Sequence, residues 1–140
     1  MSKNILITGS TDGIGKLTAI KLAKDGHAVY LHGRNSDKLA NAISEVKAAS
    51  NNENISGFIA DFSDLDEVSK MADELKAKLS TLDVLINNAG ILKTSAVSKF
   101  KDFDIRFVVN YLAPYVLTKA IVPLLENGND ARIVNLSSAA

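Results

Sequence analysis

The amino-acid sequence predicts an α/β protein built on a doubly wound parallel β-sheet. Short runs rich in Val, Ile and Leu alternate with amphipathic stretches of helical period along the whole chain. The strand-like runs are apolar without polar alternation, which is typical of parallel strands that are covered on both faces. At 140 residues the chain is long enough for one domain with a real core.

The predicted strands and helices follow one another in strict alternation. Strands are expected at 3–8, 28–32, 55–60, 82–87 and 132–136. Helices are expected at 13–24, 37–49, 64–79 and 101–126, and Ser63 or Asp64 is the expected N-cap of the third helix. Right-handed crossovers then give a Rossmann-like sheet of five strands in the order 3-2-1-4-5. The last strand would form an apolar edge close to residue 140, so we expect residues 1–140 to be a single, incomplete domain of a truncated chain.

Charge and composition argue against several classes of function. Basic and acidic residues balance at 16 each, so bulk electrostatics favour neither nucleic acid nor an anionic membrane as a partner. The absence of cysteine excludes disulfides and thiolate zinc sites. His27 and His32 have no second ligand in view, so we interpret both as structural and expect no metal site. The apolar runs are shorter than the ~20 residues of a membrane span, and we expect a soluble cytoplasmic protein.

A glycine-rich turn joins the first predicted strand to the first predicted helix. Its three glycines permit positive φ angles and a close approach of the backbone, and the helix N-terminus offers free N–H groups to a pyrophosphate. A turn that merely needs glycine is the alternative, but three glycines at this place in a βαβ unit favour a dinucleotide. The expected cofactor-binding residues of this turn are Gly9, Ser10, Thr11, Asp12, Gly13, Ile14 and Gly15.

Two motifs give the sequence a resemblance to the short-chain dehydrogenase/reductase family. The turn reads Thr-Gly-x-x-x-Gly-x-Gly, and Asn87-Asn88-Ala89-Gly90 follows the fourth predicted strand, where that family places its second signature. The resemblance covers essentially the whole chain. It implies that the backbone of Asn88, Ala89 and Gly90 lines the cofactor ribose, and that Asp61, followed by Phe62, contacts the adenine amino group.

The resemblance also implies two catalytic residues. Ser138, which follows the last predicted strand, matches the serine that hydrogen-bonds the reacting oxygen, although a serine pair with Ser137 could equally cap a loop. Asn110 matches the asparagine that holds a water in the family's proton relay. Pro114 cannot donate the hydrogen bond that the Asn110 carbonyl would accept in a helix, so we expect a bend there and a free carbonyl.

The Tyr-x-x-x-Lys pair of the family, in which Tyr is the general acid/base, does not follow Ser138 in this sequence. The one match, Tyr115 to Lys119, precedes the serine and shares a helix with Asn110. Helical geometry turns Tyr115 about 140° and Lys119 about 180° away from Asn110, so we interpret the match as accidental. Residues 1–140 would then hold the cofactor site and half of the catalytic set, and we expect them to be inactive alone.

The end of the second predicted strand favours NADP(H) over NAD(H). NAD-selective Rossmann proteins carry an acidic residue there for the ribose 2′-hydroxyl, whereas this sequence has Gly33 followed by Arg34 and Asn35. Gly33 would leave room for a 2′-phosphate, and Arg34 could pair with it. The alternative is that Arg34 is solvated or stacks on adenine. Asp12 argues against the preference, because its charge would repel a nearby phosphate.

The leading functional hypothesis is an NAD(P)(H)-dependent oxidoreductase that transfers a hydride between nicotinamide and a small carbonyl or alcohol substrate. The alternative is a non-catalytic NAD(P)-binding module, such as a redox sensor or a dimerisation partner, because the fold alone does not separate the two. The long helix at 101–126 is apolar on more than one face, so we expect it to join the subunits of a homo-oligomer in the full-length form.

Overall fold

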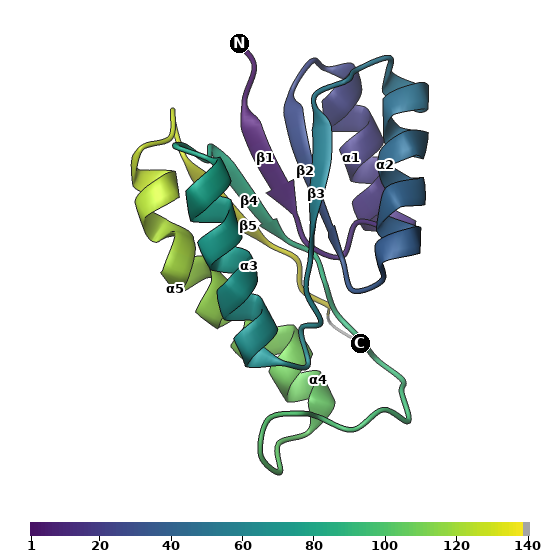
Figure 1. The fold of residues 1–140 in the computed structure, drawn as a ribbon, viewed down its shortest axis with the longest axis vertical. Helices are drawn as coiled ribbons and strands as arrows, with labels where there is room; N and C mark the ends of the chain where they lie inside the picture. The colour runs from purple at the N-terminus through teal and green to yellow at the C-terminus, as the bar shows by residue number, and fades with distance from the viewer. Residues whose placement is uncertain (139–140) are drawn as a thin grey trace.

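The computed structural model describes residues 1–138, and in it all five strands of the sheet are parallel. The strands are β1 (Asn4–Ile7), β2 (Ala28–Gly33), β3 (Ile55–Ile59), β4 (Val84–Asn87) and β5 (Arg132–Asn135). Their order is β3-β2-β1-β4-β5, with β1 at the centre (Figure 1). The predicted fold class and strand order are confirmed.

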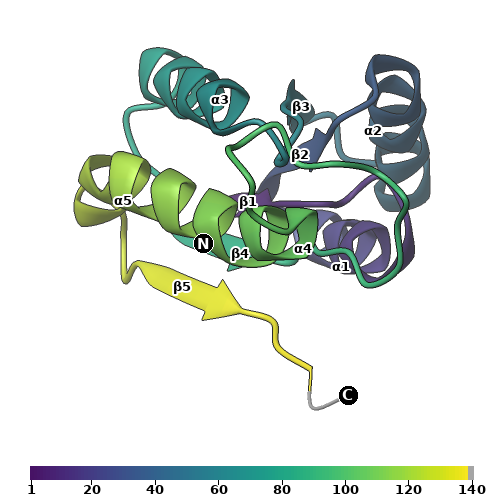
Figure 2. The same cartoon turned by 90° about the horizontal axis from the view of Figure 1, so that it is seen from below.

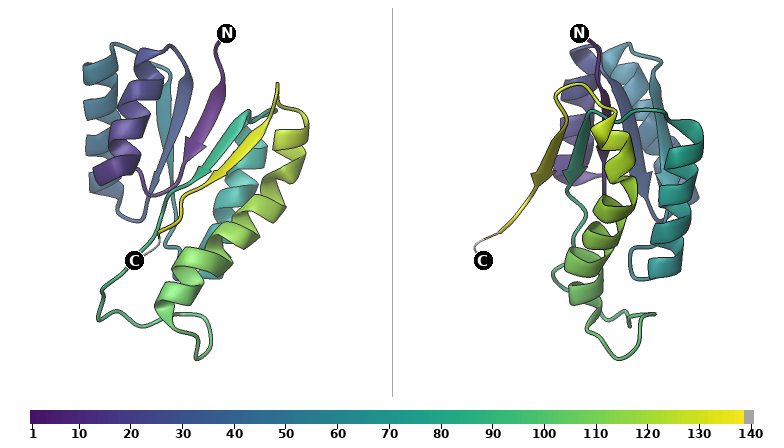
Figure 3. Two further views of the ribbon diagram at one scale, coloured as in Figure 1. Left: turned by 180° about the vertical axis from the view of Figure 1, so that it is seen from behind. Right: turned by 90° about the vertical axis from the view of Figure 1, so that its left-hand side faces the viewer.

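Helices cover both faces of this sheet. They are α1 (Gly13–Lys24), α2 (Ser36–Ser50), α3 (Leu65–Lys78), α4 (Ile105–Phe107), the π-helix η1 (Val108–Leu112) and α5 (Ala113–Glu126). α1 and α2 pack on one face, and α3 and α5 pack on the other (Figure 1, Figure 3). Each face therefore has its own hydrophobic core.

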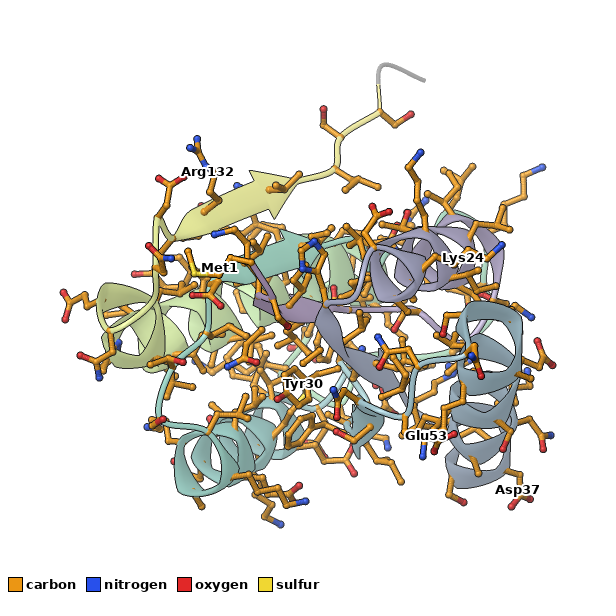
Figure 4. All side chains as sticks on the ribbon, turned by 90° about the horizontal axis from the view of Figure 1, so that it is seen from above. Met1, Lys24, Tyr30, Asp37, Glu53 and Arg132 are labelled. Carbon is orange, nitrogen blue, oxygen red and sulfur yellow. The ribbon has the colours of Figure 1, made fainter. Side chains whose placement is uncertain are left out.

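The central strands are apolar throughout because they contribute to both cores. Along β1, Ile5 and Ile7 pack with α1 and α2, whereas Leu6 packs with α3 and α5. Successive side chains of a strand point to opposite faces, so a strand that is covered on both sides has no position for a solvated residue. Tyr30 of β2 lies on the α3 side, where its ring centroid is 6.2 Å from that of Phe58 (Figure 4).

β5 forms an exposed edge, as the sequence predicts. Ile133 and Val134 are 45% and 43% exposed, and no helix among residues 1–138 lies over this strand on the side of α1 (Figure 2). β5 is attached through its parallel ladder with β4, which ends with a hydrogen bond from the Leu136 amide to the Asn87 carbonyl at 3.1 Å.

The long helix begins later than predicted. The sequence predicts a helix from residue 101, but the structure begins it at Ile105. Asp104 is the N-cap, and its carboxylate accepts a hydrogen bond from the Arg106 amide at 2.8 Å. The same carboxylate pairs with the Arg106 guanidinium at 2.7 Å, and these hydrogen bonds hold the pKa of Asp104 down to about 2.

A π-helical turn interrupts the same helix around Asn110. The Ala113 amide donates to the Val108 carbonyl, five residues back, instead of four. Pro114 follows this turn and has no N–H to give to the Asn110 carbonyl, so the regular α-helical ladder cannot continue through this point. The disturbance that the sequence predicts at Asn110 therefore takes the form of a π turn, a feature that is frequent at functional sites.

The helical stretch Ile105–Glu126 is long and apolar enough to cross a membrane by length and composition alone. The expectation that the chain contains no such segment is therefore wrong. The core helix of a soluble protein has the same two properties, and this stretch buries Leu117 and Ile121 completely in the core that it shares with α3.

Candidate functional site

A cleft of about 810 Å³ opens at the carboxyl edge of the sheet, beyond the ends of β1, β2, β3 and β4. This volume is typical of sites for small molecules and cofactors. Every cofactor-binding residue that the sequence predicts lines the cleft, with the exception of Ser10. The cleft is also lined by residues that the sequence patterns did not point to, among them His32, Lys38, Ala60 and Lys93.

The glycine turn has the backbone geometry that its sequence predicts. Gly9 and Gly13 have φ angles of +60° and +53°, in the left-handed region that favours glycine. A Cβ atom on Gly15 would lie 2.5 Å from the Gly9 carbonyl oxygen and 2.6 Å from Nδ2 of Asn88. The Asp12 side chain precedes α1 without capping it, so it leaves the first amides of that helix open to an anion.

Ser10 differs from its prediction because its side chain points into the protein. Its hydroxyl is fully buried, donates to the Ile7 carbonyl at 2.7 Å and accepts from the His32 amide at 3.0 Å. A hydroxyl that makes both bonds inside the protein is turned away from the cleft. Ser10 therefore shapes the turn and is not a residue of the cleft wall.

The Asn-Asn-Ala-Gly motif supports the glycine turn from the side of β4. Nδ2 of Asn88 donates to the carbonyls of Thr8 and Gly9 at 3.0 and 2.9 Å. The Thr8 hydroxyl accepts from the amides of Asn88 and Ala89, both at 3.0 Å. The Asn88 side chain is thus used within the protein, and the motif meets the cleft through its backbone, as the family resemblance implies.

Asp61 lies in a network of hydrogen bonds at the end of β3. Its Oδ1 accepts from the amide and the hydroxyl of Ser63 at 2.9 and 2.7 Å, and its Oδ2 pairs with Nζ of Lys99 at 3.2 Å. Partial burial acts to raise the pKa of Asp61, but the bonds from Ser63 and Lys99 outweigh it and hold the pKa below its ordinary value. The carboxylate is therefore anionic and able to accept a further hydrogen bond.

The end of β2 packs closely against the glycine turn. A Cβ atom on Gly33 would overlap with the methyl group of Thr11, so a side chain at position 33 would displace Thr11. Arg34 and Asn35 are exposed and line the cleft, and the Asn35 side chain caps α2 by accepting the Lys38 amide at 3.0 Å. Glycine at position 33 is therefore explained by contact with Thr11, and Arg34 is left as the candidate ligand.

His32 connects three parts of the cleft, which its position on a strand did not reveal. Its Nδ1 accepts from the Gly9 amide at 3.0 Å, and its Nε2 lies 2.9 Å from the Ala60 carbonyl. Its ring stacks on Phe62 with 4.1 Å between centroids. Burial lowers the pKa of His32 to about 4, against a smaller opposing effect of the bond to Ala60. The imidazole is therefore neutral at physiological pH.

The buried ring of His32 predicts a loss of stability in acid. Its pKa is 6.5 when unperturbed and about 4 in the folded protein, so between these values the unfolded chain binds a proton that the folded chain does not. We expect the free energy of unfolding to fall by about 3 kcal/mol as pH decreases from about 6.5 to 4, at about 1.36 kcal/mol for each pH unit. Urea unfolding at stepped pH measures this slope. A His32→Phe variant that keeps the whole slope would contradict the assignment.

Neither of the two predicted catalytic residues lines the cleft. Oδ1 of Asn110 accepts from the Ile91 amide and its Nδ2 donates to the Ile91 carbonyl, both at 2.8 Å, so this side chain fixes the loop that follows Gly90. Ser138 is exposed and follows β5 at the carboxyl edge of the sheet.

Tyr115 and Lys119 lie apart from this edge. Neither residue lines the cleft, and Nζ of Lys119 lies over the Tyr115 ring at 5.8 Å from its centroid. Tyr115 is 55% exposed on α5. These positions support the interpretation that the Tyr-x-x-x-Lys match in α5 is accidental.

The chain belongs to the short chain dehydrogenase family, whose pattern matches residues 3–140. Dehydrogenase/reductase SDR family member 12 of Bos taurus is 38% identical over 133 residues, which are 95% of this chain and 42% of the relative. Retinol dehydrogenase 12 of Mus musculus is 36% identical over 138 residues, which are 99% of this chain and 44% of the relative. The chain thus spans less than half the length of these curated relatives.

Solved structures give the same result for the fold. A short chain dehydrogenase of Escherichia coli CFT073 was solved in complex with NADPH. It superposes on this chain with a TM-score of 0.84 at 30% identity, and the match covers 98% of this chain and 59% of the Escherichia coli chain. RhlG of Pseudomonas aeruginosa was solved as an NADP active-site complex. It superposes on this chain with a TM-score of 0.83 at 25% identity, and the match covers 99% of this chain and 56% of the RhlG chain.

Proposed function

We propose that the protein is an NADP(H)-dependent oxidoreductase that transfers a hydride between nicotinamide and a small carbonyl or alcohol substrate. The observation that carries this proposal is the cleft at the glycine turn, where Gly9, Gly13 and Gly15 bring the backbone and the N-terminus of α1 to one wall. Family membership and the nicotinamide cofactors of two similar structures support it. Calorimetric titration with NADPH tests it, and the absence of binding would overturn it.

Each part of the cofactor has a place in this proposal. The pyrophosphate binds at the glycine turn and the first turn of α1, and the ribose beside it lies along the backbone of Asn88, Ala89 and Gly90. The adenine lies next to Phe62, with its amino group on Asp61. The bound cofactor supplies the hydride or accepts it. In this proposal Asn110 holds a water and Ser138 hydrogen-bonds the reacting oxygen.

The preference for NADP(H) rests on Arg34. No acidic residue occupies the end of β2, and the overlap with Thr11 excludes one at position 33 without rearrangement. Arg34 and Lys38 both line the cleft and both carry a positive charge. Asp12 is exposed and also lines the cleft, so it opposes a phosphate from the other side. Near the end of β2, the positive charges of Arg34 and Lys38 outweigh the charge of Asp12 and favour the phosphorylated cofactor.

We expect NADP⁺ to bind about ten- to a hundredfold more tightly than NAD⁺, because a hydrogen bond to a charged group contributes roughly 1.5–3 kcal/mol. The Arg34→Ala variant should lose most of this preference while it keeps its affinity for NAD⁺. Calorimetric titration of both cofactors provides the measurement, and Arg132→Ala, at the exposed start of β5, is the matched control (Figure 4). Equal affinities in the wild type, or equal losses for both cofactors, would show that the assignment is wrong.

The second candidate function is a non-catalytic NAD(P)-binding module. One observation favours it for residues 1–140: Tyr115 and Lys119, the one Tyr-x-x-x-Lys pair of this sequence, do not line the cleft. The two candidates agree on cofactor binding and differ only in turnover. We also place the protein in the cytoplasm, and its recovery in the supernatant of a detergent-free lysate tests this against the apolar stretch Ile105–Glu126.

Self-association through the long helix is part of the same proposal. An aromatic stripe runs along one side of this helix and the loop before it, with 5.6 Å between the rings of Phe100 and Phe103, 5.6 Å between those of Phe103 and Phe107, and 5.3 Å between those of Phe107 and Tyr111. Phe103, Phe107 and Tyr111 are all exposed by more than two fifths of their surface. An exposed aromatic row of this kind is typical of a contact between subunits.

We expect Phe107→Glu to weaken self-association by at least about tenfold, since burial of a phenylalanine side chain contributes roughly 1.5–3 kcal/mol. Light scattering after size-exclusion chromatography over a range of concentrations measures the effect. Leu17→Glu places the same charge on an apolar residue of α1 that is 67% exposed and lies outside the stripe. If both variants or neither shifts the oligomeric state, the stripe is not the interface.

A further inference from the structure

We propose that His32 is a positioning residue for the cofactor, because it fixes the distance between the two walls of the cleft. One wall is the glycine turn after β1, and the other is the segment Ala60–Phe62 after β3. The inference rests on the proposed function, in which a nicotinamide cofactor occupies this cleft. It assigns a role to a residue that looks purely structural in the sequence.

The hydrogen bonds of His32 define its chemical state. The Gly9 amide is a donor, so Nδ1 must present a lone pair to it at 3.0 Å. The Ala60 carbonyl is an acceptor, so Nε2 must carry the proton at 2.9 Å. Only the neutral imidazole with its proton on Nε2 makes both bonds. His32 is 4% exposed, so its ring has little access to water that could replace these partners.

The topology of the sheet explains why this link matters. β1 and β3 do not pair with each other, because β2 lies between them. The His32 ring reaches from β2 to both sides, and it touches the turn after β1 through Gly9 and the turn after β3 through Ala60 and Phe62. It therefore couples two loops that have no direct ladder to hold them in register.

Further hydrogen bonds between the glycine turn and the His32 backbone also hold the turn in place. The Ser10 amide donates to the His32 carbonyl at 2.9 Å, and the His32 amide donates to the Ser10 hydroxyl at 3.0 Å. With the bond from Gly9 to the ring, two successive residues of the turn are tied to His32. A turn that is fixed before the cofactor arrives does not lose that freedom on binding, which is the benefit of preorganisation.

Two substitutions separate the two hydrogen bonds. In His32→Asn the amide oxygen can stand in for Nδ1 and keep the bond from Gly9, whereas in His32→Gln the amide nitrogen can stand in for Nε2 and keep the bond to Ala60. We expect Asn to weaken NADP⁺ binding by about threefold, because the wall at Ala60 is released while the glycine turn keeps its bond from Gly9. Gln and Phe should each weaken binding by about tenfold, since the partly buried Gly9 amide of the turn loses its acceptor.

Calorimetric titration with NADP⁺ and thermal unfolding of the four proteins test the inference. Losses of affinity that are equal in Asn and Gln, or that follow the loss of Tm alone, would overturn it, because a purely structural ring predicts that result. A wild type that binds neither NADP⁺ nor NAD⁺ would overturn the proposed function instead.

Nuclear magnetic resonance of the wild type provides a test that does not depend on folding of the variants. An N–H···N hydrogen bond transmits a scalar coupling between its two nitrogens, and we expect one between the Gly9 amide nitrogen and Nδ1 of His32. The ¹⁵N shifts of the ring should report the proton on Nε2. Absence of the coupling, or a proton on Nδ1, would overturn the inference whatever the affinities are.

Discussion

A protein of residues 1–140 is expected to bind NADPH and to leave aldehydes and ketones unreduced. Positioned general acid–base catalysis is typically worth about 10²–10⁴ in rate, and the sequence has no Tyr-x-x-x-Lys after Ser138 to supply it. Tyr115 does not substitute, because it lies exposed on α5 outside the cleft. The oxidation of NADPH, followed by its absorbance in the near ultraviolet against a panel of carbonyl compounds, measures the expected loss.

The expected inactivity would be contradicted by one pattern of turnover in two tyrosine variants. Turnover at ordinary enzyme rates that disappears in Tyr115→Phe and survives in Tyr111→Phe would show that α5 carries the acid after all. The two tyrosines are a matched pair, since they lie one turn apart on the same helix and are 55% and 60% exposed. Turnover that survives both substitutions would show that another group in the chain donates the proton.

Replacement of Gly15 by alanine is expected to weaken NADPH binding by about ten- to a hundredfold. The new methyl group would lie 2.5 Å from the Gly9 carbonyl oxygen and 2.9 Å from Cα of Ser10, both of which are backbone atoms that cannot swing aside. Overpacking of this kind typically costs about 1–3 kcal/mol and moves the backbone. The backbone would therefore move in the glycine turn, which is proposed to hold the pyrophosphate.

Gly26→Ala is the control for general destabilisation. Gly26 has a φ angle of +90° and lies in the turn between α1 and β2, outside the cleft, and a Cβ atom added to it would meet no other atom within 4 Å. We expect this variant to lower Tm through backbone strain and to leave the affinity for NADPH unchanged. An equal loss of affinity in both variants would show that the Gly15 contact has no special part in binding.

The fold could be predicted because its signals are local and repeat along the chain. Apolar runs such as 28–33 alternate with helical periods, and the crossover rule then leaves few strand orders. Local chemistry also explains the confirmed cap of α3, where Asp64 accepts the Asp66 amide at 3.0 Å. The sequence predicts too early a start for the last helix, because the Asp104 cap lies within a stretch whose helical period continues on both sides of it.

The interior of the site could be predicted only in part, because it depends on residues that are distant in the sequence. Ser10 and Thr11 are neighbours in an irregular turn, where no period tells which side chain faces inward. The pair of Asp61 and Lys99 joins residues 38 positions apart. Buried Asp83 is another example, since its carboxylate accepts from the amide of Asn4 in β1 and from that of Asn129 in the loop before β5. Sequence patterns do not show which residues that are distant in the sequence come into contact in the folded chain.

The contact between Thr11 and Gly33 makes these two positions interdependent for protein engineering. A designer who wishes to turn the cleft toward NAD(H) would place an acid at the end of β2, but its Cβ at position 33 would meet the Thr11 methyl group. Serine or glycine at position 11 would remove the methyl group that this Cβ would meet. The effects of substitutions at positions 11 and 33 are therefore expected to be coupled, because the two side chains would share one space.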